Sequence, residues 1–260
     1  MKNLRIYGNA PFNVAVIHGG PGAPGSMAPV ARELAVNRGV LEPLQTASSL
    51  DGQVLELKRV LDENADLPVT LIGSSWGAWL SFIFSARYPG STKKIILVGS
   101  GPFEEKYAAN IMETRLNRLN KDERKELHSL TAAFNNPTAG DRNALLTRLG
   151  ELSNRTDTLN PLTLDTEVLE CQYDIHIKVW EEARALRSNG RLLELGKQIK
   201  CPVTALHGDY DPHPFKGVRE PLSSILKEFK FFLLKNCGHY PWLEREAKER
   251  FFELLNKEII

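Results

Sequence analysis

The feature that most constrains the fold is a set of short, mostly apolar runs, most of which lead into glycine or other turn residues. Runs of this kind suit strands that are buried on both faces, as in a parallel sheet. Helical patterns separate most of them, which predicts a mostly parallel, doubly wound α/β sheet. The predicted strands are residues 14–17, 40–44, 69–72, 95–98, 203–206 and 231–234.

Three helices are predicted between and after these strands, at residues 49–61, 220–229 and 243–255. In the first, Val54, Leu57 and Leu61 recur at helical spacing, and Asp51 is the expected cap. These helices are expected to cover the faces of the sheet.

Residues 102–196 break the alternation, because no convincing strand occurs there. Helical patterns replace it, with a capping box at Asn120 and Glu123 and a cap at Asp141. A last helix is expected from about Val168 to the pair Asn189-Gly190. The chain therefore reads as a core of residues 1–101 and 197–260 with an inserted helical cap, or lid, at 102–196.

The composition excludes several classes of protein. Among 260 residues, Lys and Arg total 33 against 32 for Asp and Glu, a balance that gives no sign of nucleic-acid binding. The three cysteines, Cys171, Cys201 and Cys237, form no C-x-x-C pair, so neither a metal nor a redox centre is expected. The N-terminus does not read as a signal peptide, and no run is long enough to cross a membrane. We expect a cytoplasmic protein with no membrane partner.

The segment GSSWG puts two serines between glycines where a strand should hand over to a helix. A Gly-x-Ser-x-Gly turn in that position holds its middle serine clear of the sheet in a strained conformation. The middle residue is Ser75, and Ser74 precedes it. We predict Ser75 as a nucleophile that needs a neighbouring base. The structural alternative is a serine-rich helix cap.

A second glycine-rich segment, HGGPG, follows the predicted strand at 14–17. Acyl transfer places negative charge on a substrate oxygen, and backbone N–H groups must meet it. We predict an oxyanion hole made by the N–H groups of Gly20 and of Trp76, the residue after the nucleophile. Taken alone, HGGPG reads better as an ordinary Gly/Pro turn, and it is the pairing with GSSWG that favours the oxyanion hole.

The acid and the base are expected after the last two predicted strands, in the order Ser, Asp, His. The first of these strands is followed by HGDYDPHP and the second by KNCGH. We predict Asp211 as the acid, with Asp209 as the alternative, and His239 as the base. His213 lies in the acid's loop and could contact substrate. The other histidines, His18, His128, His176 and His207, read as structural.

Together, HGGPG, GSSWG, HGDYDP and CGH resemble the α/β-hydrolase fold superfamily. HGGPG and the tryptophan after the nucleophile are similar to the proline iminopeptidase branch. The resemblance covers nearly the whole chain, with residues 102–196 in the place of the family's cap. It implies a serine hydrolase without a cofactor, acting on a small molecule or short peptide.

The branch implies removal of an N-terminal residue, often proline, by an enzyme whose cap carboxylates hold the free ammonium group. The candidates here are Glu104, Glu105 and the pair Glu181-Glu182, each of which also reads as a solvated helix face. Tyr173 and Trp180 are predicted to line the substrate pocket. A carboxylesterase, a C–C bond hydrolase and a non-catalytic ligand-binding protein stay open as alternatives, as do a monomer and a homodimer.

Overall fold

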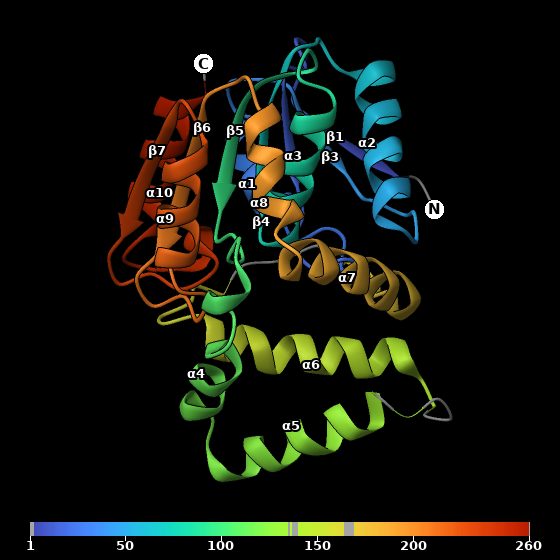
Figure 1. Cartoon of the computed structure of the whole chain (residues 1–260), viewed down its shortest axis with the longest axis vertical. Coiled ribbons are helices and arrows are strands. Elements are labelled where there is room, and N and C mark those ends of the chain that lie inside the picture. The colour runs from blue at the N-terminus through green and yellow to red at the C-terminus, as the bar shows by residue number, and fades with distance from the viewer. Residues whose placement is uncertain (1–2, 135, 137–139, 164–168, 260) are drawn as a thin grey trace.

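A seven-stranded sheet forms the centre of the computed structural model, which describes residues 3–134, 136, 140–163 and 169–259 (Figure 1). The strand order is β1-β3-β2-β4-β5-β6-β7. All neighbours are parallel except β1, which is antiparallel to β3. The predicted α/β-hydrolase fold class is therefore confirmed. The strands are β1 (Leu4–Tyr7), β2 (Val14–Ile17), β3 (Val40–Pro43), β4 (Val69–Ser74), β5 (Thr92–Val98), β6 (Val203–Gly208) and β7 (Phe229–Leu234).

Helices cover both faces of the sheet, and the strand side chains alternate between them. In β2, Ala15 and Ile17 join a core beneath one set of helices, whereas Val14 and Val16 join the core on the opposite face. The first face carries α2 (Leu50–Asn64), α3 (Trp76–Arg87) and α9 (Lys216–Ile225). The second carries α1 (Ala28–Leu34) and α10 (Lys248–Glu258). This two-sided burial explains why the central strands read as continuous apolar runs.

Several local predictions differ from the structure, and the helix predicted at 243–255 begins only at Lys248, as α10. The cap of α2 is Ser49, whose side chain accepts from the N–H of Gly52, while Asp51 pairs with Arg87 instead. Helix α9 begins four residues earlier than predicted, at Lys216, and ends before Phe229, because Phe229 pairs with Val203 in the sheet. Strand β1 was not predicted; it is a short edge strand whose sequence carries no continuous apolar run.

Between β5 and β6 the described residues form helices and no strand of the sheet. The two helix starts predicted here are confirmed: Asn120 and Glu123 exchange hydrogen bonds before α5, and Asp141 caps α6. The last predicted helix begins at Tyr173, and Val168 lies outside the described residues. The helices are η1 (Glu105–Tyr107), α4 (Ile111–Arg118), α5 (Lys121–Phe134), α6 (Arg142–Asp157), α7 (Tyr173–Ser188), α8 (Arg191–Glu194) and η2 (Leu195–Gln198).

Figure 1 shows α4, α5, α6 and α7 beyond the end of the sheet toward which β5 points. Helices α5 and α6 share a small core of their own around Leu127 and Leu152. By contrast, Val179 and Ala183 of α7 belong to the core of the sheet's first face. The division of the chain into a core and a cap at 102–196 stays a prediction. No helix in the described ranges is long and apolar enough to span a bilayer.

Candidate functional site

Ser75 sits alone at the joint between β4, which ends at Ser74, and α3, which begins at Trp76. Its backbone has φ +52° and ψ −114°, a conformation that non-glycine residues rarely adopt. The Ser75 N–H donates to the carbonyl oxygen of Val98, which fixes the turn to the end of β5 (3.0 Å). The joint is therefore a sharp, strained elbow.

The two glycines of GSSWG are required by close backbone approaches. A Cβ atom on Gly73 would lie 2.1 Å from the carbonyl oxygen of Gly77. One on Gly77 would lie 2.2 Å from the carbonyl oxygen of Ile17, at the end of β2. Only glycine fits at either place, so the spacing of the motif follows from the packing of α3 against β2 and β4.

The two serines differ in access. The Ser74 hydroxyl is buried without a hydrogen-bond partner, whereas Ser75 is only half-buried. Among the described residues the Ser75 hydroxyl has no hydrogen-bond partner, and it is not sealed off as that of Ser74 is. Of the two, Ser75 is the serine that a substrate can reach.

The HGGPG loop lies against this elbow. A Cβ atom on Gly19 would lie 3.1 Å from the Cβ of Ser75. His18 is fully buried, and its ring contacts the carbonyl oxygens of Gly19 (2.8 Å) and Leu44 (3.1 Å). These contacts give His18 a structural role. Burial lowers the pKa of His18, more strongly than these carbonyl oxygens raise it. His18 thus ties the loop to the end of β3.

Gly20 has φ +56°, which turns the backbone of the loop at the residue predicted to supply an oxyanion donor. Neither its N–H nor that of Trp76 donates a hydrogen bond to any acceptor within the described ranges. Two unused backbone donors thus belong to the two segments that meet beside Ser75. Their role as an oxyanion hole stays a prediction.

Asp211, not Asp209, contacts His239. The Nδ1 atom of His239 lies 2.7 Å from Oδ2 of Asp211, and both side chains are buried. Asp209 accepts instead from the N–H of Cys237 and lies 3.6 Å from the Lys235 ammonium group, so it holds the turn after β7. Because β6 and β7 are parallel neighbours, their carboxyl ends bring the two loops together.

Burial and the neighbouring charges shift the pKa values of both Asp211 and His239. Burial favours the neutral form of Asp211, but His239, His213 and His207 outweigh it and hold its pKa well below the ordinary value. Burial alone would lower the pKa of His239, but the Asp211 carboxylate and its hydrogen bond raise it above the ordinary value. The pair is therefore an ionised acid that makes its imidazole more basic.

Ser75 and His239 are both held at the end of β5. The Ser75 N–H is hydrogen-bonded to the carbonyl oxygen of Val98. A Cβ atom on Gly99, which follows Val98, would lie 3.1 Å from Nδ1 of His239. Within the described structure the Ser75 hydroxyl makes no hydrogen bond to His239. Catalytic hydrogen bonds of this kind are often long in the absence of substrate and tighten when it binds.

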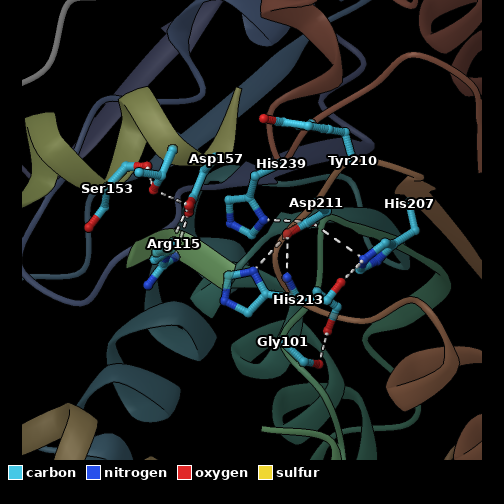
Figure 2. Close-up of polar contacts among 12 residues, drawn as sticks. Gly101, Arg115, Ser153, Asp157, His207, Tyr210, Asp211, His213 and His239 are labelled. Carbon is cyan, nitrogen blue, oxygen red and sulfur yellow. Dashed lines mark hydrogen bonds and ion pairs between the residues drawn. The ribbon is translucent and has the colours of Figure 1, made fainter. Parts of the chain in front are cut away.

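A second imidazole shares the same carboxylate. The Nδ1 atom of His213 lies 2.8 Å from Oδ1 of Asp211, and its ring centroid is 4.6 Å from that of His239 (Figure 2). These three side chains are a possible set of metal ligands by type and proximity. However, direct nitrogen–oxygen contacts of 2.7 and 2.8 Å leave no space for an ion between the carboxylate and either ring. Hydrogen bonding accounts for this cluster.

Helix α4 supports the loops that carry Asp211 and His239. The sequence did not predict these contacts. The His239 N–H donates to the carbonyl oxygen of Asp157 (2.7 Å), and the carboxylate of Asp157 is held by two nitrogens of Arg115 (2.8 and 2.5 Å). Arg118 donates to the carbonyl oxygen of Tyr210 and stacks on its ring. Figure 2 shows Arg115 and Asp157 beside the two imidazoles. No spacing pattern joins these residues, because they meet only in three dimensions.

Glu244 was also missed. Its buried carboxylate accepts from the backbone N–H groups of Gly238 (2.9 Å), Leu159 (2.8 Å) and Asn160 (2.8 Å). The segment that follows α6 and the loop that carries His239 are thereby joined through one side chain. In the sequence Glu244 stands in the charged stretch LEREAKER, which reads as a solvated surface.

Three of the four acidic residues proposed to hold an ammonium group have other partners, whereas Glu181 is exposed and has none among the described residues. Glu104 pairs with Lys106 (3.0 Å) and Glu105 with Arg187 (2.7 Å). Glu182 accepts from the N–H of Leu50 at the start of α2 (2.8 Å). None of these contacts involves Ser75, Asp211 or His239. These three carboxylates are therefore engaged elsewhere in the structure, and an ammonium-binding role for any of the four stays a prediction.

The two aromatic residues predicted to line the pocket both pack against other groups. The Tyr173 hydroxyl donates to the carbonyl oxygen of Phe134 (3.0 Å). Trp180 stacks on Trp79 of α3, with ring centroids 5.8 Å apart and planes only 8° apart. Trp180 thus joins α7 to the helix that begins at the serine elbow.

We expect Trp180→Ala to lower the free energy of unfolding by about 3 kcal/mol, since the stacked ring and its packing are lost. Thermal denaturation checks this value. A shift in kcat/KM that differs across a series of acyl chain lengths would place Trp180 in the pocket. A uniform fall in step with stability would assign it to packing alone.

The family comparison agrees with this geometry. A family model described as alpha/beta hydrolase fold matches residues 21–246. No curated protein sequence that was compared matches the chain. Among solved structures, that of VinJ is similar at a TM-score of 0.66 and 18% identity, over 98% of this chain and 93% of that one.

Two other solved structures carry names that state an activity. One describes Est816 as an N-acyl homoserine lactone degrading enzyme (TM-score 0.64, 14% identity, 98% of this chain and 96% of that one). The other is a proline iminopeptidase from Mycobacterium smegmatis (TM-score 0.64, 17% identity, 98% and 92%). At these identities the likeness is one of fold, and it agrees with the resemblance read from the motifs.

Proposed function

The chain belongs to the alpha/beta hydrolase fold family, and from that premise we propose that it is a serine hydrolase that cleaves a small ester or amide bond through an acyl-enzyme. The observation that carries the proposal is the contact between His239 and Asp211 at the end of the sheet where Ser75 stands on its strained elbow. A nucleophile, a base and the acid that orients the base are the parts such a reaction needs.

In the proposed first step, Nε2 of His239 takes the proton of the Ser75 hydroxyl as its oxygen attacks the substrate carbonyl carbon. Asp211 keeps the other proton of the ring on Nδ1 and stabilises the imidazolium ion that forms. The N–H groups of Gly20 and Trp76 are proposed to bind the oxyanion, which is supported by their lack of other acceptors among the described residues.

His239 then gives its proton to the leaving group, and the bond between the carbonyl carbon and that group breaks. In the second half, His239 takes a proton from water, which attacks the ester formed with Ser75. Collapse of that intermediate releases the acid and returns the proton to the Ser75 oxygen. No cofactor is needed for any of these steps.

Ester hydrolysis is favoured over removal of an N-terminal residue. An aminopeptidase must hold a free ammonium group, and of the four candidate carboxylates only that of Glu181 lacks a cationic or N–H partner among the described residues. The similarity of HGGPG and GSSWG to proline iminopeptidases supports the peptidase as the second candidate. Two further alternatives have the same three residues: a C–C bond hydrolase would use them for catalysis, and a ligand-binding protein would bind without turnover.

Hydrolysis of a series of p-nitrophenyl esters, beside proline and alanine naphthylamides, tests this choice. We expect turnover of short-chain esters by the wild type and none above background by Ser75→Ala. Turnover of the naphthylamides alone would favour the peptidase. Tight binding without turnover of any substrate would favour the ligand-binding protein.

The raised pKa of His239 predicts how activity depends on pH. The ring must be unprotonated to accept the Ser75 proton, so kcat/KM should fall as the pH drops through this raised pKa. The midpoint of the acid limb should lie above 6.5, the ordinary value for histidine. A pH profile of kcat/KM measures it, and a midpoint well below that of free histidine would contradict the proposed pair.

A further inference from the structure

The imidazole rings of His239 and His213 are hydrogen-bonded to the two oxygens of one carboxylate, that of Asp211. His239 contacts Oδ2 of Asp211 through Nδ1 (2.7 Å), and His213 contacts Oδ1 through Nδ1 (2.8 Å). The His213 backbone N–H also donates to Oδ1 (2.9 Å). An ionised carboxylate can only accept hydrogen bonds, so the proton of each ring lies on Nδ1. The Nε2 atom of His213 in its neutral form is therefore an acceptor.

The geometry also gives the direction of that acceptor. In an imidazole, Nε2 lies on the side of the ring away from the group bonded to Nδ1. The rings of His213 and His239 lie 4.6 Å apart and are tilted by only 31°, so both Nε2 atoms face away from Asp211. In Figure 2 the two rings lie one above the other, with Asp211 on one side and Arg115 on the other. The Nε2 atom of His213 thus faces the same way as that of His239, the atom proposed to take the Ser75 proton, and Arg115 lies on that side too.

The acceptor has no partner within the part of the chain that the structure describes. The third histidine of the cluster differs: Nε2 of His207 donates to the carbonyl oxygen of His213 (2.8 Å), and its Nδ1 is buried without a partner. Nε2 of His213 is not sealed in this way, and its side chain keeps 13% exposure. Burial lowers the pKa of His213 below the ordinary value, more strongly than the attraction of Asp211 raises it, and so favours the neutral ring.

A polar atom beside the reacting groups exchanges its water for substrate on binding, and an acceptor left unmatched then lowers affinity. A site with such an acceptor therefore favours a substrate that brings a donor. We propose that His213 is a specificity-determining residue, whose Nε2 accepts a hydrogen bond from a hydroxyl or amine hydrogen that the substrate carries close to its scissile carbonyl group. This inference rests on the proposed function, since it assigns the substrate class of that same site.

The test compares esters that differ by one donor. Ethyl butyrate is paired with the ethyl esters of 2-hydroxy-, 3-hydroxy- and 2-aminobutyric acid, and with 2-hydroxyethyl butyrate, so that donors on both sides of the carbonyl are sampled. We expect the wild type to prefer at least one donor-bearing member by about tenfold in kcat/KM, the effect of one well-placed hydrogen bond. Acid release in a pH-stat measures each rate.

Two variants separate the acceptor from the bond to Asp211. His213→Asn keeps a side-chain N–H in the place of Nδ1 but has no atom at Nε2, whereas His213→Phe loses both. We expect His213→Asn to reduce the preference to within about twofold of unity, because the donor-bearing esters lose more kcat/KM than ethyl butyrate does. His213→Phe should lower the rates on all esters. The matched control is His128→Asn, at an exposed histidine of α5, which should change neither the preference nor the rates.

Two results overturn the inference: a wild type that prefers no donor-bearing ester, or a His213→Asn variant that keeps the preference. In both cases continued hydrolysis of ethyl butyrate leaves the proposed serine hydrolase standing. Absence of turnover on every ester, together with no reaction of Ser75 with a fluorophosphonate, rejects the proposed function itself and the inference with it. Unchanged melting temperatures of the variants exclude a loss through misfolding.

Discussion

Replacing Ser75 by alanine is expected to lower kcat by about 10⁶ on any ester that the protein hydrolyses, by analogy with the loss of a serine nucleophile in other triads. Without the hydroxyl no acyl-enzyme can form, and only binding and the two backbone donors are left to act on the substrate. The fold should survive, because the Ser75 side chain has no hydrogen-bond partner among the described residues and the elbow is fixed by its backbone N–H.

The control is Ser74→Ala. The Ser74 hydroxyl is buried without a hydrogen-bond partner, so its removal should leave kcat within about threefold and should not destabilise the protein. Single-turnover and steady-state rates for the two variants make the comparison. If Ser74→Ala lost the activity and Ser75→Ala kept it, the elbow would have been assigned to the wrong serine.

Replacing Asp211 by asparagine is expected to lower kcat by about 10⁴, the effect of the same change in another Ser-His-Asp triad. An amide has one acceptor oxygen, yet two Nδ1 atoms, those of His239 and His213, contact the carboxylate. At least one ring must then turn or change its tautomer. The acid limb of the pH profile should also move to lower pH, because the charge that raises the pKa of His239 is gone.

Asp209→Asn is the matched control, two residues away in the same loop. Asp209 holds the turn after β7 through the N–H of Cys237 and does not contact His239. We expect it to cost less than about tenfold in kcat, with some loss of stability. A larger loss for Asp209→Asn than for Asp211→Asn, with both variants folded, would reverse the assignment of the acid.

The sheet could be predicted because its central strands are buried on both faces. Residues 14–17 were predicted as a strand with the bounds that β2 has in the structure. The edge strand β1 escaped prediction, since it spans only Leu4–Tyr7 and only Leu4 among these residues is buried. Helix bounds were less certain, because competing caps such as Ser49 and Asp51 stand two residues apart.

The candidate site could be proposed because its residues follow strand ends, and the carboxyl ends of parallel strands meet at one edge. That rule brings the loops of Ser75, Asp211 and His239 together from sequence alone. It says nothing about Asp157 and Glu244, which accept from the His239 loop, or about Arg115, which holds Asp157, because these contacts depend on how the helices between β5 and β6 pack. Nor could it assign the Nδ1 proton of His213 to the second oxygen of Asp211.

The most direct test of the central claim is to treat the folded protein with a fluorophosphonate and to locate the adduct by mass spectrometry. The reagent forms a covalent bond with a serine that a neighbouring base activates. We expect a single adduct on Ser75, its absence from Ser75→Ala, and much slower formation in Asp211→Asn. An adduct on Ser74, or no adduct in protein that is fully folded, would contradict the account.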